Sequence, residues 1–356
     1  MESPAGNALR DYPQILVTGG SGWLGERVVR ALSVGMPGLG ALGRGGQRVR
    51  CLVPAPGAPG PLAGLGISLM RGDLRRAADC DAFCEGAADG LLLHLAQLDE
   101  SAGRTRLMRE VNVTGTQHLL AAARRAGLRR MVLLSTGDAV GFSAYHDLSP
   151  EEAPPVKPYL THGRLAAERE ALLDPVPADA LETVVARVPW VYGPGQPGRL
   201  VQLLRRIKEG RVLYLGDGNN LVPLVHVDSA VLGLLLCGFV PGAAGGRYWI
   251  ADARSYPLKG IVEAVRLAMQ RDFGLRPPAK ARHVPGALAD GARTLEVLLE
   301  GFGLASSRLR QWSELNLSAS CDIGPARRDL GYAPQVELRE GMRRQVAWML
   351  EQGLYL

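Results

Sequence analysis

A glycine-rich turn near the start of the chain most constrains its fold. Residues 14–32 read QILVTGGSGWLGERVVRAL: an apolar run over Ile15–Val17, a glycine cluster, and then apolar residues at helical spacing. The spacing Gly19-x-x-Gly22-x-x-Gly25 lets the backbone bend sharply, approach a pyrophosphate and pack the helix against the strand. The helix N-terminus adds unpaired N–H groups and the positive end of the helix dipole. The sequence therefore predicts a strand, a turn and a helix that bind a dinucleotide.

Composition limits the class of protein. With 356 residues, of which 47% are hydrophobic and 21% charged, the chain is long enough for one large domain or two unequal lobes. The formal net charge is +6, but the basic residues are dispersed and aromatic residues make up only 5%. Because no basic block is interleaved with aromatic side chains, we do not expect a nucleic-acid partner.

Cysteine usage and hydropathy favour a cytoplasmic protein without a membrane span. The five cysteines are scattered and form no C-x-x-C pair, which fits a reduced compartment and no disulfide framework. Residues 1–11 lack the pattern of a signal peptide. The most apolar long window, Leu221–Val240, contains His226 and Asp228 and is expected to be a buried strand and helix. The six histidines are spread singly, so we expect no metal site.

Apolar runs that alternate with helical stretches predict a doubly wound parallel sheet in an α/β fold. We expect His94, inside one apolar run, to be packed in the core. The strands expected after the first are Arg48–Val53, Ile67–Met70, Gly90–Leu95, Met131–Leu134 and Val184–Arg187, and the helices between them include Cys80–Ala87, Leu107–Ala126 and Leu160–Leu173.

The residues after the second strand leave the choice between NAD and NADP open. An acidic residue there accepts the ribose 2′-OH, whereas an arginine accommodates a 2′-phosphate. Here the strand runs into VPA at 53–55, so neither is in place, and three nearby arginines are close only in sequence. After the third strand, Asp73 has two equally supported interpretations, a helix cap or a contact to adenine.

An ordered set of motifs carries a family resemblance. The motifs are TGGSGWLG (18–25), GDL (72–74), HLA (94–96), NVTGT (112–116), LLSTGDAVG (133–141), PY (158–159), ARVPWVYGPG (186–195), HVD (226–228) and DIGPARRDLGYAPQVELREGM (322–342). Together they resemble an extended short-chain dehydrogenase/reductase, nearest the 3β-hydroxysteroid dehydrogenase and NAD-dependent epimerase/dehydratase branch. The resemblance extends from about Gln14 to Met349.

This resemblance implies a Rossmann domain over residues 12–192 that binds NAD or NADP. Residues 193–356 are then mainly a smaller C-terminal α/β substrate lobe, with a segment at about 221–240 returning to the Rossmann domain. The resemblance also implies that Asp73 contacts adenine, that Asn112 supports the active-site helix, and that the turn at Pro189 lies near the nicotinamide. The residues expected to bind the cofactor are Gly19, Gly22, Trp23, Leu24, Gly25, Asp73, Leu74, Leu95, Ala96, Asn112 and Pro189.

The catalytic residues depart from the family pattern of a Ser/Thr, a Tyr and a Lys four residues after the Tyr. Thr136 and Tyr159 are present, but Gly163 stands in place of the lysine. That lysine lies one helical turn from the tyrosine and favours tyrosinate. Without it, a tyrosine of unperturbed pKa about 10 is expected to stay protonated at neutral pH. A neutral tyrosine donates a proton in ketone reduction but is a poor base for alcohol oxidation.

His162 is the third candidate catalytic residue. It follows Tyr159 by three residues, so it lies close to the same helix face, and a histidine titrates near neutrality. Its alternative role is in packing or at the surface.

We therefore expect an NAD(P)-dependent oxidoreductase that interconverts keto and hydroxy groups, in the direction of ketone reduction, on a hydrophobic substrate of steroid or polyketide type. The apolar content of residues 287–317 suits such a substrate or a core. Because the lysine is absent, two alternatives remain on the same fold: a non-redox lyase, dehydratase, isomerase or cyclase, and a nucleotide-binding pseudoenzyme. The expected partner is the small-molecule substrate, with a homodimer as the candidate assembly.

Overall fold

The computed structural model describes residues 9–54, 60–98, 105–141, 161–174, 181–196, 198–285, 287–302 and 318–354. The candidate catalytic residue Tyr159 lies outside these ranges.

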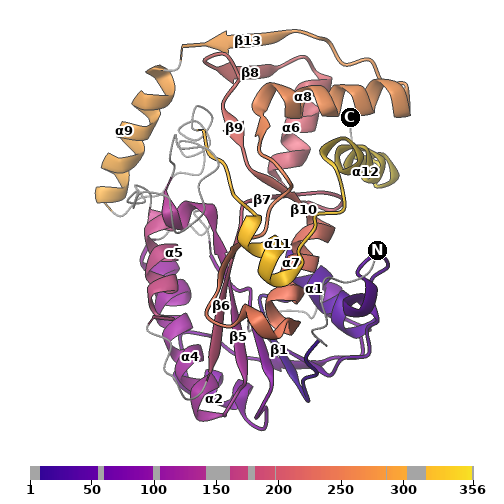
Figure 1. The fold of residues 1–356 in the computed structure, drawn as a ribbon. Helices are drawn as coiled ribbons and strands as arrows, with labels where there is room; N and C mark the ends of the chain where they lie inside the picture. The colour runs from indigo at the N-terminus through magenta and orange to yellow at the C-terminus, as the bar shows by residue number, and fades with distance from the viewer. Residues whose placement is uncertain are drawn as a thin grey trace.

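A seven-stranded parallel sheet, in the order β11-β6-β5-β4-β1-β2-β3, forms the lower half of the molecule (Figure 1). The strand order reverses beside β1, where β4 lies on one side and β2 on the other, and open α/β sheets bind ligands at such a point. The predicted doubly wound parallel sheet is confirmed. The strands are β1 (Ile15–Thr18), β2 (Val49–Val53), β3 (Ser68–Arg71), β4 (Leu91–His94), β5 (Arg130–Thr136), β6 (Glu182–Val188) and β11 (Arg247–Trp249).

Helices cover both faces of this sheet (Figure 1). Buried side chains of α1 and α7 share one core with the sheet, and those of α2 and α4 share a second core on the opposite face. The helices are α1 (Trp23–Ser33), α2 (Ala77–Cys84), α3 (Thr105–Arg109), α4 (Gly115–Arg125), α5 (Thr161–Ala171) and α7 (Val227–Phe239).

Two predicted helices have different bounds in the structure. The helix expected over Leu107–Ala126 contains a π-helical turn at Glu110–Thr114, between α3 and α4, which brings Asn112 into the interior. The helix expected over Cys80–Ala87 begins at Ala77 and ends at Cys84. The buried residues Cys80, Phe83 and Cys84 mark only one side of this helix, so the pattern missed the three residues before Cys80.

The strands β5 and β6 are longer than predicted because polar residues continue their ladder. Arg130 pairs with Glu182 at one end, and Thr136 pairs with Val188 at the other. An apolar run alone cannot reveal the longer strand, because Arg130 is charged and is fully buried only through hydrogen bonds that it donates to distant segments.

The apolar window 221–240 is a buried strand and helix, as predicted. It holds β9 (Leu221–Val222), β10 (Leu224–His226) and α7, and α7 is buried on nearly every side. Among the residues that the structure describes, no helix is long and apolar enough to cross a membrane. All five cysteines are free.

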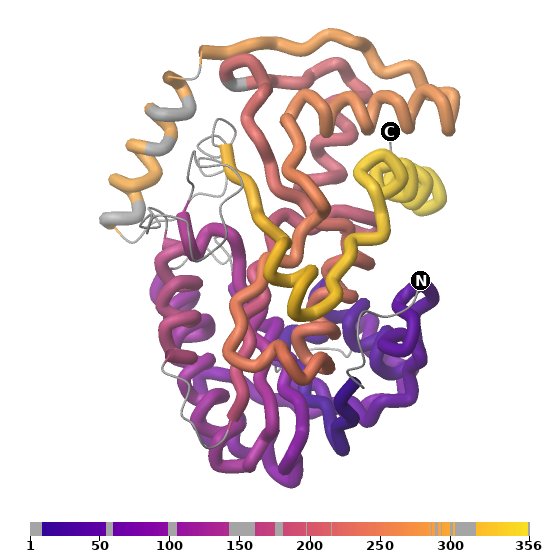
Figure 2. The backbone as a smooth tube through the Cα atoms, in the orientation of Figure 1, coloured from indigo at the N-terminus to yellow at the C-terminus, as the bar shows by residue number. Residues whose placement is uncertain are grey.

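The upper half of the molecule has its own hydrophobic core, to which α6, α8 and α12 contribute. Figure 2 shows that the chain after residue 318 descends beside the sheet, forms α11 and then rises into α12. The elements of this half are β7 (Trp190–Tyr192), α6 (Arg199–Lys208), β8 (Val212–Leu215), β12 (Tyr256–Pro257), α8 (Leu258–Leu267), β13 (Ala281–Val284), α9 (Ala287–Gly301) and α12 (Leu338–Glu351). Helix α11 (Gly324–Leu330) instead adds Ala326 and Leu330 to the core that the sheet shares with α1 and α7. Short 3-10 or π turns lie at Gly40–Gly43, Gly60–Leu62, Gly137–Val140, Pro241–Ala243 and Ala268–Asp272.

Candidate cofactor and catalytic site

The glycine turn between β1 and α1 has the shape that a pyrophosphate requires. Gly19 has φ +74°, and a Cβ there would lie 2.6 Å from the backbone nitrogen of Ala96. A Cβ on Gly25 would lie 2.1 Å from the Gly19 carbonyl oxygen, whereas one on Gly22 would meet nothing closer than 3.4 Å. Backbone atoms thus pack tightly against Gly19 and Gly25, whereas the turn has free space at Gly22. No side chain caps α1. The first N–H groups of α1 suit phosphate oxygens, so these residues fit a dinucleotide.

The segment after β4 is held from below by Asn112. The Asn112 side chain accepts a hydrogen bond from the Leu98 nitrogen at 2.7 Å and donates one to the Leu98 oxygen at 2.8 Å. Leu95 is buried and Ala96 half-buried, next to Gly19. This post-β4 segment, Leu95–Leu98, therefore has a fixed backbone beside the glycine turn.

Asp73 does not cap a helix. The N-cap residue of α2 is Arg76, and the Asp73 carboxylate instead binds the Arg75 guanidinium at 2.6 Å and the Arg75 nitrogen at 2.9 Å. These hydrogen bonds from Arg75 lower the pKa of Asp73. The cap interpretation is therefore wrong, and the adenine contact stays a prediction. Leu74 is buried next to Asp73, against α4.

The end of β2 offers the ribose no acidic side chain. Val53 is followed by an uncharged sequence through Gly66. The nearest charged residue in the neighbouring strand is Arg71, which stands opposite Val53 in the β2–β3 register and is exposed.

Three polar side chains gather at the carboxyl end of β5. Thr136 ends the strand, and its Oγ1 accepts a hydrogen bond from the Asp138 nitrogen at 3.4 Å. His162, on α5, lies with its Nε2 3.9 Å from Asp138 Oδ2 and is 7% exposed. When His162 is protonated, Asp138 is its counter-ion. The structure thus brings Thr136 and His162 to opposite ends of Asp138, a residue that the sequence reasoning did not single out.

A buried ion cluster anchors α5 to the sheet next to Thr136. Ser135 Oγ donates to Glu170 at 2.5 Å, and the Arg187 guanidinium donates to the same carboxylate at 2.7 Å. Arg247 adds a bond to Glu170 at 3.1 Å. Ser135 therefore has a structural role on one side of β5, while Thr136 lies on the other.

The turn at Pro189 connects β6 to β7 and leads to an exposed aromatic residue. Trp190 is 44% exposed, and the Arg199 guanidinium lies 5.4 Å from its ring centroid. Farther along, the Pro194 carbonyl accepts hydrogen bonds from Trp23 at 3.1 Å and Arg27 at 2.5 Å, both on α1. The segment after Pro189 is therefore attached directly to the helix that begins at the glycine turn.

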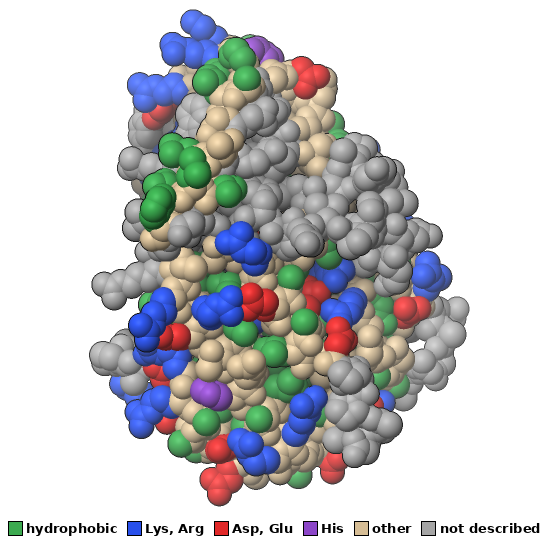
Figure 3. Space-filling view, turned by 90° about the vertical axis from the view of Figure 1, so that its left-hand side faces the viewer, with side chains coloured by type: hydrophobic (Ala, Val, Ile, Leu, Met, Phe, Trp, Pro, Cys, Tyr) green, Lys and Arg blue, Asp and Glu red, His purple; other side chains and the backbone are tan. Residues whose placement is uncertain are grey.

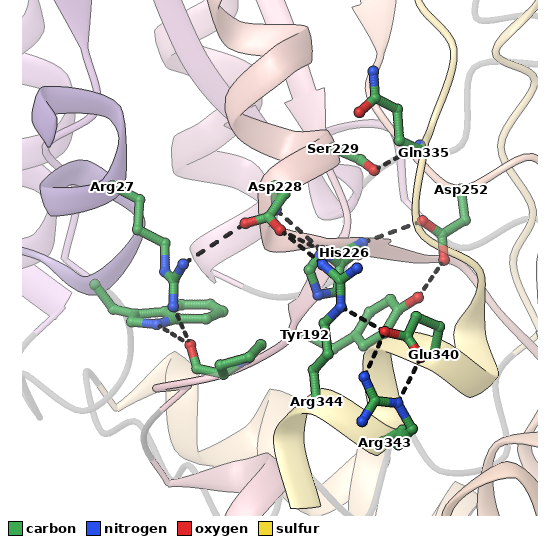
Figure 4. Close-up of polar contacts among 12 residues, drawn as sticks. Arg27, Tyr192, His226, Asp228, Ser229, Asp252, Gln335, Glu340, Arg343 and Arg344 are labelled. Atoms are coloured by element: carbon green, nitrogen blue, oxygen red, sulfur yellow. Dashed lines mark hydrogen bonds and ion pairs between the residues drawn. The ribbon is translucent and has the colours of Figure 1, made fainter. Parts of the chain in front are cut away.

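The motif HVD at 226–228 organises a polar cluster between the two halves (Figure 4). His226 Nδ1 accepts a hydrogen bond from the Asp228 nitrogen at the start of α7. The Asp228 carboxylate lies 3.7 Å from Arg27 of α1 and 3.4 Å from Arg344 of α12. Glu340 binds Arg344 at 2.8 Å. This alternation of charges joins the first helix of the chain to its last one.

Asp252 is a buried carboxyl group in the same region. It accepts hydrogen bonds from the His226 nitrogen at 3.1 Å, the Tyr192 hydroxyl at 3.0 Å and the Tyr256 hydroxyl at 3.3 Å. Burial raises the pKa of Asp252 to about 6, and burial lowers the pKa of His226 to about 4. Both groups are neutral more readily than usual, which suits a site without solvent.

His94 is a packed core residue, as predicted. It is fully buried, and its two ring nitrogens contact Thr18 at 2.7 Å and Thr116 at 2.9 Å. Burial and the nearby charge of Arg169 lower its pKa well below the usual value. Within the described ranges, no group of three or more His, Cys, Asp and Glu side chains is arranged to hold a metal ion.

Comparison with known proteins finds relatives whose similarity extends over nearly the whole chain. Residues 15–240 match the model of the NAD dependent epimerase/dehydratase family. The chain is 35% identical over 343 residues to the uncharacterized protein y4nL of Sinorhizobium fredii, with 96% of each chain covered. It is 30% identical over 348 residues to the 2-alkyl-3-oxoalkanoate reductase of Stenotrophomonas maltophilia, with 93% of this chain and 98% of the relative covered.

Solved structures have the same fold. The dTDP-glucose 4,6-dehydratase DesIV of Streptomyces venezuelae, with NAD and TYD bound, superposes with a TM-score of 0.69. It is 24% identical, and the match covers 96% of this chain and 98% of that one. At this identity, the likeness establishes the architecture.

Proposed function

The chain belongs to the NAD dependent epimerase/dehydratase family, and we propose that it reduces the ketone group of a hydrophobic small molecule with NADH or NADPH. Membership of this family makes it a nicotinamide-dependent enzyme of oxidoreductase type. The direction of the reaction, the substrate class and the catalytic residues are the parts that we propose.

The observation that carries the proposal is the group Thr136, Asp138 and His162 at the end of β5. A hydroxyl, a carboxylate and an imidazole lie together at the carboxyl edge of the sheet, where the family places its reaction. An imidazolium that rests against a carboxylate is a proton donor that does not depend on a lysine. Such a group supports reduction, in which the enzyme must donate a proton.

The proposed reduction needs a hydride from the cofactor and a proton from the enzyme. A bound NADH or NADPH supplies a hydride to the carbonyl carbon. The carbonyl π bond breaks, and its oxygen takes a proton from the enzyme to give an alcohol. We assign the hydrogen bond that polarises this oxygen to Thr136, and the proton to Tyr159 with His162 as its source. Each proton donor of this kind contributes typically about 10²–10⁴-fold to the rate.

A hydrophobic substrate is supported by exposed apolar side chains in the upper half of the molecule. Trp190 presents a partly exposed ring next to Pro189. Leu298 of α9 is 58% exposed and Phe302, just after α9, is 82% exposed, so the interpretation of these two residues as core is wrong. Figure 3 shows this side of the molecule, with a group of hydrophobic side chains along the upper left and with hydrophobic, acidic and basic side chains intermixed over the lower part. The reductase among the relatives is named for a 2-alkyl-3-oxoalkanoate, and we propose a substrate of this chemical kind.

The test is consumption of NADH and of NADPH by the purified protein with a panel of ketones: long-chain 3-oxo acids, steroid ketones and cyclic polyketide ketones. We expect turnover with a hydrophobic 3-oxo compound and formation of one alcohol per reduced cofactor consumed. Binding of the cofactor without turnover over the whole panel would contradict the proposed reaction.

Two substitutions test the residue roles. His162→Gln should lower kcat by at least about 10-fold, as loss of a proton donor does, while His283→Gln on exposed β13 serves as the matched control and should not. Gly163→Lys should restore the family charge and raise turnover. If Tyr159→Phe and His162→Gln both keep the parent kcat, neither residue handles the proton.

A further inference from the structure

Arg169 is the one feature of α5 that neither the family pattern nor the proposed reaction explains. This arginine is 2% exposed, deep between α5 and the carboxyl edge of the sheet. Long cationic side chains are almost never fully buried unless they are paired. Within the part of the chain that the structure describes, however, Arg169 touches no carboxylate.

All acceptors of the Arg169 guanidinium are neutral. Its Nη2 donates to the Ala96 carbonyl at 3.2 Å, and its Nη1 donates to Gln97 Oε1 at 3.2 Å. Its Nε donates to Thr116 Oγ1 at 3.3 Å. Two of the three acceptors belong to the post-β4 segment, which lies against the glycine turn at Gly19.

A chain of hydrogen bonds with one possible direction connects Arg169 to the glycine turn. Thr116 has a single hydroxyl proton, which it donates to the Asn112 carbonyl at 2.5 Å. His94 Nε2 must therefore carry a proton and donate to Thr116, so His94 Nδ1 accepts from the Thr18 hydroxyl. Thr18 Oγ1 in turn accepts from the Ala96 nitrogen at 3.3 Å.

This series of hydrogen bonds uses both ring nitrogens of His94 and the hydroxyl groups of Thr18 and Thr116. The network therefore holds Thr18, which precedes Gly19, and Ala96, which lies next to Gly19, in one arrangement. Arg169 closes it, since it holds both Thr116 and the Ala96 carbonyl.

Among the described residues, no carboxylate that contacts Arg169 balances its charge. The nearest carboxylate, Glu170, is already bound by Arg187 and Arg247, and Asp174 is bound by Arg247. Both of these carboxylates are thus paired with arginines other than Arg169. Burial lowers the pKa of Arg169 to about 10, as expected for a cation without a contacting anion.

We propose that Arg169 is a positioning residue of the cofactor site, which fixes the post-β4 segment and supplies, from inside the protein, a positive charge that the anionic dinucleotide balances. The inference deepens the proposed function: it rests on the binding of the cofactor there and not on the identity of the ketone. It also names a cation in a site whose usual lysine is replaced by Gly163.

The experiment measures the Kd of NADH by calorimetry for the parent, Arg169→Lys and Arg169→Met, or that of NADPH where the parent prefers it. We expect Arg169→Met to weaken binding by at least about 10-fold, which is about 1.4 kcal/mol, and Arg169→Lys to restore most of the affinity. The parent Kd should rise more steeply with salt than the Arg169→Met Kd, because only the parent carries the buried charge.

Arg130→Met is the matched control. Arg130 is also a fully buried arginine that binds backbone carbonyls, but it lies at the opposite end of β5. This variant should be less stable and yet bind NADH with the parent Kd once folded. If Arg169→Met does not fold, the neutral polar variant Arg169→Gln replaces it in the same comparison.

Two results would overturn the inference: a folded neutral variant with the parent Kd, or an Arg169→Lys variant that binds as weakly as the neutral one. Either outcome is independent of ketone turnover. If the parent binds NADH but reduces no ketone, the proposed reaction fails while the role of Arg169 is still measured.

Discussion

The cofactor side and the catalytic side of the sheet use their polar groups differently. Around β1 and β4, the side chains from Thr18 to Arg169 form a closed hydrogen-bond chain beneath the glycine turn. At the end of β5, His162 and Asp138 are 3.9 Å apart, and the helix position of the family lysine is Gly163. The first region is held in one geometry, whereas in the second, under the proposed roles, a glycine stands where the family resemblance places a lysine.

The difference indicates how such a chain changes its chemistry while it keeps its cofactor. A dinucleotide site depends on backbone shape, and the side chains beneath it serve that shape. In the proposed reaction, proton transfer depends on a few side chains, which are exchanged without rebuilding the sheet. Four sets of substitutions test whether the two regions are separable in this way.

The largest effect is expected at Gly25. A Cβ at this position would lie 2.1 Å from the Gly19 carbonyl oxygen, so Gly25→Val must push α1 away from the turn. We expect NADH binding to weaken by at least about 100-fold, as measured by calorimetry. Gly260→Ala, in α8 with only Pro257 within reach at 3.7 Å, is the control that should bind as the parent does. Parent-like affinity of Gly25→Val would contradict the account of the turn.

The second substitution removes a buried arginine far from both regions. Arg130 donates to the carbonyls of Gly238 at 2.8 Å and Val240 at 2.6 Å, at the end of α7, and to Glu182 at 2.8 Å. Arg130→Met removes all of these bonds from a buried charged donor, and we expect a loss of about 3–5 kcal/mol in the free energy of unfolding. Arg129→Met, a half-exposed neighbour 3.6 Å from Glu182, should cost less than about 1 kcal/mol in the same urea titration. Equal losses for both variants would show that the buried bonds add nothing.

Adjacent residues on β5 separate catalysis from structure. Thr136→Val removes the hydroxyl that we assign to the ketone oxygen, so kcat should fall about 10- to 100-fold with an unchanged Kd for NADH. Ser135→Ala removes the bond to Glu170 and should instead lower stability by about 1–3 kcal/mol. Steady-state kinetics and thermal unfolding of both variants measure the two effects. The assignment fails if Ser135→Ala loses the activity and Thr136→Val does not.

The smallest effect is a pair of opposed pH dependences between the two halves. The pKa of Asp252 is raised from 3.8 to about 6, so its contribution to stability is fully present below pH 3.8 and is lost as the pH rises through about 6. The pKa of His226 is lowered from 6.5 to about 4, so its contribution is present above pH 6.5 and is lost as the pH falls through about 4. Between about pH 4 and pH 6, the changes in stability from the two groups have opposite signs and nearly cancel.

Single substitutions should reveal the pH-dependent contribution of each group to stability. Relative to the parent, Asp252→Asn is expected to lose about 2–3 kcal/mol of stability between pH 7 and pH 4, and His226→Gln is expected to gain stability over the same interval. Urea unfolding at several pH values measures both differences. Parallel pH profiles for all three proteins would contradict the assigned shifts.

Much of the fold was predictable because its signals are local. The glycine turn, the apolar strands and the buried helix in 221–240 are each encoded within about 20 residues. Their bounds were less predictable, since Thr136 and Arg130 extend β5 through pairing that an apolar run does not reveal.

The candidate site was predictable only in part. The positions of Gly19, Gly22 and Gly25 follow from their spacing, but the role of Arg169 depends on Ala96, 73 residues away. Arg130 meets Gly238 across 108 residues. Such contacts exist only after folding, and a buried arginine looks like any surface arginine in the sequence. Asp138 had a weaker signal, since it stands two residues after Thr136 in the same motif.

The most direct test of a retained cofactor site with altered proton chemistry is a single-turnover experiment. Protein that is saturated with NADH is mixed with a long-chain 2-alkyl-3-oxo acid, and the loss of NADH fluorescence is followed for the parent and for His162→Gln. The account predicts rapid loss in the parent, formation of the hydroxy acid, and a slower loss in the variant at equal NADH occupancy. NADH that stays bound and unconsumed in the parent, with this acid and with every other ketone of the panel, would contradict it.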